Sequence, residues 1–237
     1  MNSIQSMPSI ENRILAALPD SEREQLLVHL EPFTLDHSAI LCDIGVRIEY
    51  VYFPNSGMIS LISHTEEGET LEVGIVGYEG MVGLSVFLES YKSQYRTLVQ
   101  TTGHAFRMKA GTFQSAGDRQ ASLRSLMRRY TQARMTQITQ AAICIRFHTL
   151  ESRLCRWLLQ SQDCVKSDEL ELTQDFIAMM LGTHRPGVSL VAGTLQNAGL
   201  IRYSRGHITI LDRQRLEASS CECYKVIRHA LDGFTWT

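Results

Sequence analysis

The segment from Leu172 to Asp212 limits what this chain can fold into more than any other part of it. Thr173 is a favourable N-cap, and the apolar residues after it recur at helical spacing up to Gly182, a residue typical of helix ends. A second predicted helix follows and is closed by Gly199. The next residues alternate in polarity around Ser204-Arg205-Gly206, which is typical of a hairpin turn. Two short helices and a hairpin predict a winged helix-turn-helix, a motif that places its second helix in the major groove of DNA.

The predicted second helix begins with residues suited to DNA. Arg185 stands where side chains reach base edges, and its guanidinium can bind guanine O6 and N7 together; a phosphate or solvent contact is the alternative. Pro186 suits a first helical turn, and Gly187 lets the backbone approach DNA closely. Helix N-termini and wing residues are suited to phosphate. The candidate DNA-binding residues are Thr173, Gln174, Thr183, His184, Arg185, Pro186, Gly187, Ser189, Arg202 and Arg205, with His207 as a further wing residue.

Charge is divided unevenly along the chain. Residues 1–118 contain 7 Lys and Arg against 15 Asp and Glu, whereas residues 119–237 contain 16 against 10. A protein that binds a phosphate backbone needs basic residues, because each neutralised phosphate releases counterions. The imbalance favours double-stranded DNA as the partner of the C-terminal half, with ordinary unevenness between domains as the alternative.

The composition, with 44% hydrophobic and 20% charged residues, is that of an ordinary soluble globular protein. No apolar run approaches the roughly 20 residues that a membrane-spanning helix needs. The N-terminus lacks the basic stretch and apolar core of a signal peptide. We therefore expect a cytoplasmic protein.

Three zones are visible along the chain. Residues 10–30 predict two short amphipathic helices. From about residue 38 to residue 109, short apolar runs separated by glycines predict a β-sandwich or small barrel. Residues 119–180 contain neither Gly nor Pro, which favours long helices. We expect an α+β fold divided into residues 1–118, 119–148 and 149–237.

The first long helix is predicted over residues 119–148. At 1.5 Å per residue it would span about 45 Å, more than a small domain needs to cover one face. We therefore expect it to pair with a second copy of the chain; packing on its own barrel is the alternative. Arg134 and Gln137 interrupt the apolar spacing, so a strict heptad repeat is not predicted. The residues assigned to the dimer helix are Leu123, Met127, Tyr130, Ile138, Ala141 and Ile145.

Two stretches resemble a known family. The run from Met179 to Glu217 resembles the C-terminal domain of Crp/Fnr-type bacterial transcription regulators, and the ending Cys221–Tyr224 is similar to one that recurs in a branch of that family. Ile48–Ile62 resembles two early strands of the family's sensor barrel. The resemblance implies an N-terminal cyclic-nucleotide-binding-like jelly roll, a dimerisation helix and a C-terminal winged helix-turn-helix.

The resemblance also implies a function: a homodimer that regulates transcription at promoter DNA, with RNA polymerase as a further partner. A two-fold symmetric dimer favours a palindromic site with half-sites about one helical turn apart. Pro186 and Leu190 stand where Crp itself has polar groups, so the target sequence need not match that of Crp.

The sequence of the predicted barrel does not favour cyclic AMP as its effector. Family members that bind it carry a Gly-Glu pair, whose carboxylate accepts the ribose hydroxyl, followed by an Arg-Ser or Arg-Thr pair for the phosphate. Here Arg96-Thr97 matches the second pair, but the upstream position is Gly83-Leu84 and has no carboxylate. That loss should cost about 1.5–3 kcal/mol of binding. We therefore expect the barrel to respond to a signal other than cyclic AMP and Arg96 to have an acidic or structural partner. The residues assigned to the effector pocket are Gly83, Leu84, Arg96 and Thr97. A cyclic-nucleotide-responsive regulator is the alternative, with Glu79 as a substitute only after a loop shift.

The cysteines predict no metal or cofactor. Iron–sulfur sensors of the Fnr kind use clustered N-terminal cysteines, whereas the N-terminal zone here has only Cys42. The pair Cys221 and Cys223 is a weak metal signal, because two thiols need further ligands. We expect packing roles for these and for Cys144, Cys155 and Cys164. The histidines His29, His37, His64 and His104 show no axial-ligand pattern for haem.

Enzymatic activity is also not indicated. A cupin-type barrel enzyme needs clustered histidines, and His37, His64 and His104 are too scattered to supply them. The sequence contains no Ser nucleophile elbow, Walker loop or HExxH motif. The remaining alternative is a non-enzymatic adaptor that uses its helix-turn-helix to bind a protein partner, in which case promoter binding would be absent.

Overall fold

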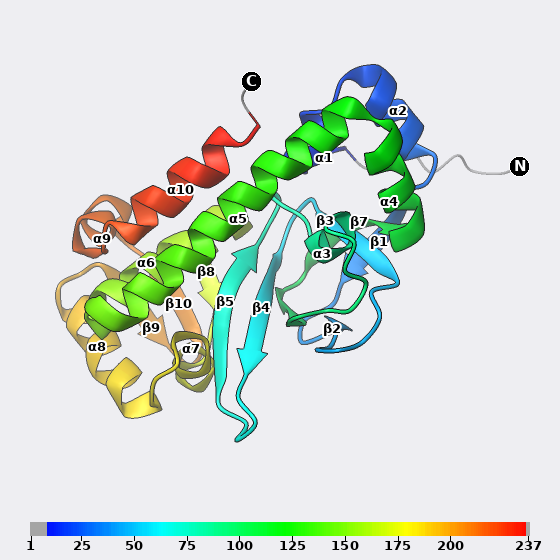
Figure 1. Ribbon diagram of the computed structural model, residues 1–237. Coiled ribbons are helices and arrows are strands. Elements are labelled where there is room, and N and C mark those ends of the chain that lie inside the picture. The colour runs from blue at the N-terminus through cyan, green and yellow to red at the C-terminus, as the bar shows by residue number, and fades with distance from the viewer. Residues whose placement is uncertain (1–8, 236–237) are drawn as a thin grey trace, which may run out of the picture.

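A β-rich N-terminal half and a smaller C-terminal domain are joined by a long helix, α5 (Ala121–Phe147), in the computed structural model, which describes residues 9–235 (Figure 1). The two short helices expected at the start of the chain are present. The elements before α5 are α1 (Arg13–Ala16), α2 (Asp20–Leu27), β1 (Glu31–Leu35), β2 (Ile40–Cys42), β3 (Tyr50–Pro54), β4 (Met58–His64), β5 (Thr70–Val76), α3 (Leu84–Phe87), β6 (Arg96–Thr101), β7 (Gly103–Lys109) and α4 (Ala110–Arg119).

The strands of this half form two antiparallel sheets, ordered β1-β7-β3 and β2-β6-β4-β5. Alternate side chains of each sheet point inward and meet in one apolar cluster, which includes Leu35 and Ala105 from the first sheet and Ile59, Val76 and Val99 from the second. The β-sandwich or small barrel expected from the glycine-separated strands is therefore confirmed.

Strand β1 lies outside the predicted strand region, which began at about residue 38. It pairs with β7, from Glu31 opposite Arg107 to Leu35 opposite Gly103. Only Leu35 is buried in this strand, and Pro32 is tolerated because β1 is at the edge of its sheet. The prediction missed β1 because an edge strand with one buried residue shows little alternation of polarity.

The helical region has a break that the sequence did not indicate. The long helix expected over residues 119–148 corresponds to α5 (Ala121–Phe147). The sequence did not indicate α4 (Ala110–Arg119) directly before it, and the extended backbone of Gln120 (φ −99°, ψ 113°) separates the two helices. The carboxylate of Glu22, on α2, accepts hydrogen bonds from the backbone N–H groups of Ser122 and Leu123 at 3.3 and 3.1 Å. A cap supplied from so far away in the sequence leaves no local pattern.

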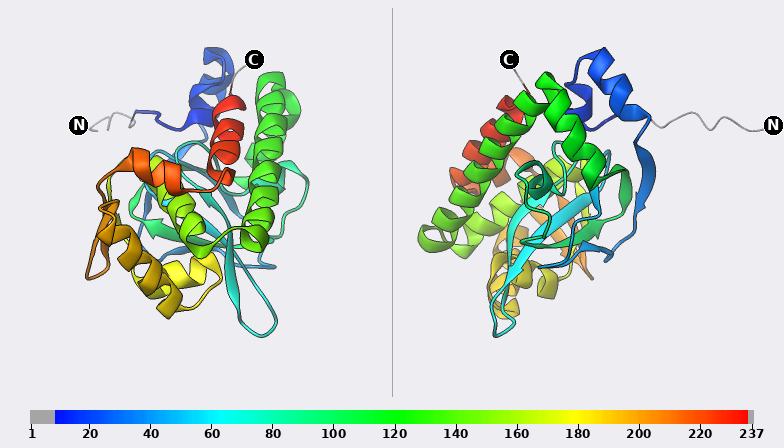
Figure 2. Two further views of the ribbon diagram at one scale, coloured as in Figure 1. Left: turned by 90° about the vertical axis from the view of Figure 1, so that its left-hand side faces the viewer. Right: turned by 45° about the vertical axis from the view of Figure 1, so that its right-hand side comes forward.

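The predicted winged helix-turn-helix is present in the C-terminal domain. A third strand, β8, extends its hairpin in the order β8-β10-β9, and the last helix, α10, runs back along α5 (Figures 1 and 2). The elements are α6 (Leu150–Val165), β8 (Glu169–Glu171), α7 (Gln174–Leu181), α8 (Arg185–Asn197), β9 (Ile201–Ser204), β10 (His207–Ile210), α9 (Arg213–Ser219) and α10 (Cys223–Gly233).

The C-terminal domain packs directly on the barrel. One apolar cluster joins Met58 and Ile75 of the barrel to Trp157 and other residues of α6. Beside it, the carboxylate of Glu72 accepts a hydrogen bond from Trp157 Nε1 at 2.7 Å. The position of the helix-turn-helix relative to the barrel is therefore fixed by both apolar and polar contacts.

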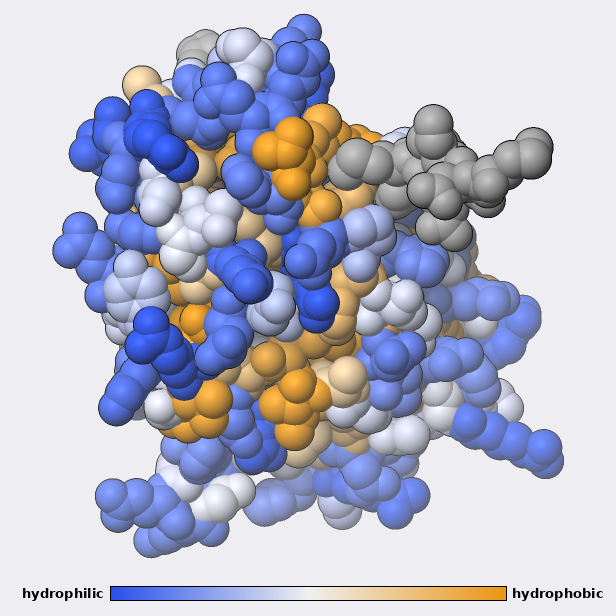
Figure 3. Space-filling view, turned by 90° about the vertical axis from the view of Figure 1, so that its right-hand side faces the viewer, coloured by the Kyte–Doolittle hydropathy of each residue, from blue (hydrophilic) through white to orange (hydrophobic). Residues whose placement is uncertain are grey.

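Apolar surface is distributed unevenly. On the face with the barrel and the N-terminal helices, hydrophilic side chains surround small groups of apolar ones (Figure 3). Across residues 9–235, no helix combines the length and the apolar character that crossing a membrane requires. The helix α5, in contrast, exposes several large apolar side chains: Met135, Ile138, Ile143, Ile145 and Phe147.

Candidate nucleic-acid interface and sensor pocket

The first helix of the motif, α7, is built by local interactions. The hydroxyl of Thr173 caps it by accepting a hydrogen bond from the backbone N–H of Phe176 at 3.2 Å. Gly182 ends it in the left-handed conformation (φ 58°), as the sequence predicted. The helix buries Ile177, Met180 and neighbouring apolar residues against the domain. Its N-terminus, with Thr173 exposed, remains at the surface.

The second helix, α8, has one buried face and one exposed face. It begins at Arg185, with Pro186 in its first turn, and buries Val188, Ala192 and Leu195. The opposite face carries the residues predicted to contact DNA. Of these, His184, Arg185, Pro186 and Ser189 are exposed, and Leu190 beside them is 74% exposed.

Arg185 is held only loosely. Its side chain is 63% exposed, and its Nε lies 3.6 Å from Oδ2 of Asp175, a residue of α7 that is also exposed. An exposed pair of this kind contributes at most about 1 kcal/mol. The guanidinium can therefore leave Asp175 for another acceptor at little cost.

Gly187 has a different role from the one predicted. A Cβ at this position would lie 3.1 Å from Cδ2 of Leu150, on α6, and 3.7 Å from Oγ1 of Thr183. The missing side chain therefore faces the protein's own α6. The space at Gly187 allows α8 to pack closely, and the expected approach of its backbone to DNA is corrected.

The wing is a tight hairpin. Strands β9 and β10 are joined by Arg205 and Gly206, both with positive φ (48° and 83°), which a two-residue turn of this handedness requires. The Gly206 carbonyl accepts a hydrogen bond from the Leu172 N–H at 2.7 Å and ties the turn to the start of α7. Arg202, Arg205 and His207 are exposed on the wing.

The predicted effector residues do not all reach one cavity. Gly83, Leu84 and Thr97 line a cavity of about 70 Å³ inside the barrel, together with tyrosines such as Tyr52 and with Arg134 and Ile138 of α5. Pockets for drug-sized ligands are about 300–1,000 Å³. The cavity in this structure is well below that range.

Arg96, the fourth predicted effector residue, is paired with a carboxylate. Its Nε and Nη2 donate hydrogen bonds to the two oxygens of Asp43 at 3.1 and 2.9 Å. The bond from Arg96 holds the pKa of Asp43 below its usual value. The expectation that Arg96 serves an acidic partner is confirmed, and that partner is Asp43.

The face of α5 that the sequence assigned to a dimer divides into two parts. Leu123, Met127 and Tyr130 are buried against the protomer's own barrel, so these three are corrected to barrel contacts. The interrupting residue Arg134 is also buried, and its Nη1 donates to the Ile75 carbonyl at 2.8 Å. A separate stripe lies at the surface; we call it the α5 seam, and it consists of Met135, Ile138, Ala142 and Ile145.

The spacing of the α5 seam alternates between three and four residues, which is the repeat of a coiled-coil contact. The predicted residues Ile138 and Ile145 belong to it, and Ala141, which is partly buried, lies beside it. The sequence did not predict this heptad repeat because the apolar residues of α5 belong to two faces of the helix, one against the barrel and one in the α5 seam, and the sequence does not separate them.

Comparison with known proteins identifies one domain of the chain and structures with a similar fold. Residues 152–219 match the family model of the Crp-like helix-turn-helix domain. The chain is of the Crp/Fnr type in its fold and in this domain. No curated protein matches it significantly.

Several solved structures share the Crp/Fnr-type fold. FixK2 from Bradyrhizobium japonicum is 15% identical, with a TM-score of 0.69 over 81% of this chain and 98% of its own. The c-di-GMP responsive global regulator CLP from Xanthomonas campestris is 18% identical, with a TM-score of 0.64 over 82% and 100%. The CRP/FNR family regulator TTHA1359 from Thermus thermophilus is 18% identical, with a TM-score of 0.64 over 80% and 98%.

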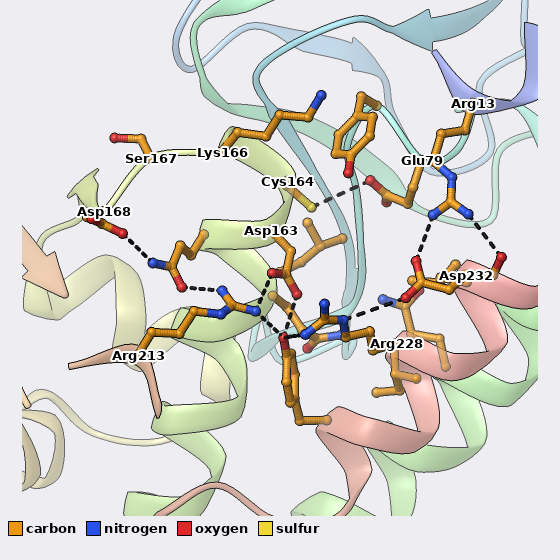
Figure 4. A pocket seen from close by; sticks show the side chains of 18 residues that line it. Arg13, Glu79, Asp163, Cys164, Lys166, Ser167, Asp168, Arg213, Arg228 and Asp232 are labelled. Atoms are coloured by element: carbon orange, nitrogen blue, oxygen red, sulfur yellow. Dashed lines mark hydrogen bonds and ion pairs between the residues drawn. The ribbon is translucent and has the colours of Figure 1, made fainter. Parts of the chain in front are cut away.

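The chain has a larger cavity, of about 390 Å³, where α6, α9 and α10 meet the barrel (Figure 4). Its charged side chains already pair with one another. Arg213 Nη2 lies 2.7 Å from Oδ1 of Asp163, whose Oδ2 accepts from the Tyr224 hydroxyl at 2.8 Å. Arg13 Nη1 donates to Oδ1 of Asp232 at 2.8 Å. The pair of Arg13 and Asp232 joins α1 of the N-terminal half to α10, whereas Asp163, Arg213 and Tyr224 all lie in the C-terminal domain. These contacts leave few charges in the cavity free for a ligand.

Glu79 lines this larger cavity and is absent from the lining of the barrel cavity. It accepts a hydrogen bond from the Gly77 N–H at 2.9 Å, and burial raises its pKa. It therefore does not supply the carboxylate missing at Leu84.

The cysteines fall into two groups. Cys155 and Cys164 are buried in the packing of α6, and Cys42 lies beside the barrel cavity. Cys144, Cys221 and Cys223 instead gather in one buried cluster, although the sequence suggested packing roles for all of them. The signal that could have linked them is the helical spacing of Cys144 and His148, four residues apart on α5.

Proposed function

We propose that the chain is a homodimeric, sequence-specific DNA-binding regulator of transcription that acts in the cytoplasm and is not an enzyme. The observation that carries this proposal is the exposed start of α8. Arg185 faces solvent there, and Val188 on the opposite face of the helix is buried in the domain. A helix attached by one face and free on the other can enter the major groove. The Crp-like domain at residues 152–219 supports the same conclusion.

In this proposal Arg185 binds guanine O6 and N7, with His184 and Ser189 beside it in the groove. Leu190 is suited to a thymine methyl group, since it is apolar and exposed on the same face. Phosphates would be bound by Thr183, by the α7 N-terminus at Thr173 and Gln174, and by Arg202 and Arg205 of the wing.

We assign the two-fold contact to the α5 seam. Apolar side chains at coiled-coil spacing that the protomer itself leaves exposed favour a second copy of the same helix as their partner. The proposed division into residues 1–118, 119–148 and 149–237 follows from this assignment; residues 1–8 and 236–237 lie outside the described part of the chain. The dimer would bind a palindromic promoter site and act on RNA polymerase.

The proposed signal is something other than cyclic AMP. Three observations support this: the small barrel cavity, the pairing of Arg96 with Asp43, and Leu84 at the ribose position. The fold alone does not select the signal, since a similar structure belongs to a regulator described as c-di-GMP responsive. The test is isothermal titration calorimetry with cyclic AMP at physiological concentration, for which we expect no binding. Micromolar affinity would overturn this part of the proposal.

The test of DNA binding begins with mapping the genomic sites that the protein occupies. Fluorescence anisotropy on such a site should show affinity that falls steeply with salt, because phosphate contacts release counterions. Arg185→Ala should cost about 1–3 kcal/mol and relax specificity at one base pair. Arg119→Ala, which removes an exposed arginine from α4, is the matched control.

Two results would contradict the proposed DNA contacts. Unchanged affinity and specificity of Arg185→Ala would refute the role assigned to Arg185. Occupancy of promoters without any salt-dependent affinity of the purified protein for DNA would instead indicate an adaptor that binds a protein partner.

A further inference from the structure

Four side chains with metal-binding atoms meet at the C-terminal end of α5. Cys144 is in its last turn and His148 is its C-cap, while Cys221 and Cys223 flank the start of α10. Their ligand atoms all lie within 4.8 Å of one another. The Sγ atoms of Cys144 and Cys221 are 3.5 Å apart, and Cys223 Sγ is 3.6 Å from His148 Nδ1.

The two short separations, between Cys144 Sγ and Cys221 Sγ and between Cys223 Sγ and His148 Nδ1, are those of ligands around a single tetrahedral ion. Zinc binds thiolate sulfur at about 2.3 Å and imidazole nitrogen at about 2.0–2.1 Å. In a tetrahedron, those bond lengths place two sulfurs about 3.8 Å apart and a sulfur and a nitrogen about 3.6 Å apart. The two measured distances agree with these values to within a few tenths of an ångström. A cluster of two or more irons would need a wider set, because ligands of different irons lie further apart.

His148 is oriented as a ligand. Its Nδ1 faces Cys223, and its Nε2 lies 3.2 Å from Oε1 of Glu222. Metal-bound histidines commonly donate their other ring N–H to a carboxylate, which fixes the tautomer and the ring orientation. Glu222 therefore leaves the lone pair of Nδ1 directed at the cysteines.

The three cysteines of the cluster are closed to solvent, and the His148 side chain is 18% exposed. Cys144 and Cys223 are fully buried and Cys221 is 6% exposed. Three cysteines and a histidine complete a tetrahedral set, and this leaves no open position for a substrate or water. The composition is that of structural zinc sites, whose metal stabilises the fold.

We propose that Cys144, His148, Cys221 and Cys223 bind a structural Zn²⁺ ion. The ion fastens the start of α10 to the end of α5, two segments that the sequence separates by more than 70 residues. It thereby fixes the path of α10 along α5 and the junction between α5 and the DNA-binding domain. This site is independent of the proposed DNA contacts and of the α5 seam.

The first test is the metal content of the full-length protein, purified without chelator and measured by inductively coupled plasma mass spectrometry. We expect about one Zn²⁺ per chain. Chelation followed by titration with Co²⁺ should produce the visible absorption of tetrahedral Co²⁺ and thiolate charge-transfer bands. This titration uses the unmodified protein, so it remains decisive if a variant fails to fold.

The second test compares variants. Cys144→Ser and Cys223→Ser should each lower zinc affinity by more than about tenfold, since loss of a ligand exceeds loss of its supporting carboxylate. Glu222→Gln should lower it by about tenfold, and Cys42→Ser, outside the cluster, should leave it unchanged. Circular dichroism establishes that each variant is folded.

Three results would overturn the proposal. The first is absence of zinc from the purified protein together with no tetrahedral Co²⁺ spectrum. The second is zinc that binds equally well to the Cys144→Ser and Cys42→Ser variants. The third is a disulfide among these cysteines, found by mass spectrometry in protein kept under reducing conditions, which would make the cluster a thiol pair and not a metal site.

Discussion

Glu72 lies where the barrel meets the C-terminal domain, and its ionisation should set part of the pH dependence of stability. Its carboxylate accepts hydrogen bonds from Trp157 Nε1 at 2.7 Å and from Gln100 Nε2 at 3.2 Å, and it pairs with the Ser60 hydroxyl. Burial raises the pKa of Glu72 from 4.5 to about 7, although these hydrogen bonds act in the opposite direction. The residue keeps some exposed surface, but its carboxylate is enclosed by these donors.

The sign of the effect follows from the raised pKa. Below pH 4.5 the carboxyl is protonated in both the folded and the unfolded chain, and its ionisation costs no stability. Between pH 4.5 and about 7 the unfolded chain loses this proton first, so stability falls as the pH rises. Above about pH 7 both states are ionised and the loss is constant. At about 1.4 kcal/mol per pH unit, a pKa raised from 4.5 to about 7 gives a full loss of at most about 3.5 kcal/mol.

The substitution Glu72→Gln keeps an acceptor for Trp157 and cannot ionise. The free energy of unfolding, measured with urea and circular dichroism at one fixed protein concentration, should fall with pH in the unmodified protein more than in this variant. Between about pH 5 and pH 8 the difference in unfolding free energy should shift by about 2.5 kcal/mol in favour of Glu72→Gln. Glu69→Gln, at an exposed position beside β5, should show no such shift. Parallel curves for Glu72→Gln and the unmodified protein would refute the reasoning.

Three further predictions concern other parts of the chain. Ile138→Glu should convert the proposed dimer to a monomer in sedimentation velocity, whereas Val28→Glu, at the exposed end of α2, should not; a dimeric Ile138→Glu variant would contradict the assignment of the α5 seam. Tyr130→Phe leaves the buried N–H of Met81 without its partner at 3.0 Å, so the free energy of unfolding should fall by about 1–3 kcal/mol, and an unchanged value would be inconsistent with this contact. Replacing the contacted thymine by uracil should weaken binding by about 1 kcal/mol in the unmodified protein and not in Leu190→Ala; equal losses would exclude the methyl contact.

The helix-turn-helix could be predicted because each of its signals acts within a few residues. Thr173 caps α7 with its own hydroxyl, and Gly182 and Gly199 end α7 and α8 with positive φ. The turn at Arg205 and Gly206 requires positive φ at both positions. Thr173, Gly182, Gly199 and Gly206 are the residue types that their local conformations favour, so these signals are visible in the sequence without knowledge of any distant contact; Arg205, which also adopts positive φ, is not such a type.

Features that depend on distant partners could not be predicted in the same way. The break before α5 is capped by Glu22, and the space at Gly187 is needed because of Leu150. Hydrophobic periodicity identified the apolar positions of α5 but not the surface that each side chain contacts. Leu123 packs against its own barrel, whereas Met135 is exposed to solvent. Likewise, four ligand atoms from two distant segments form a cluster only after the chain has folded.

The barrel cavity and the proposed dimer contact share a side chain, and this couples them. Ile138 lines the cavity and also belongs to the α5 seam. Arg134, one turn earlier, lines the same cavity and is held by the Ile75 carbonyl. A ligand can shift a conformational equilibrium only through different affinities for its two states. In a dimer joined through the α5 seam, a molecule that enlarged the cavity by moving Ile138 would therefore change the free energy of dimerisation, and by reciprocity dimerisation would change the affinity for that molecule by the same factor.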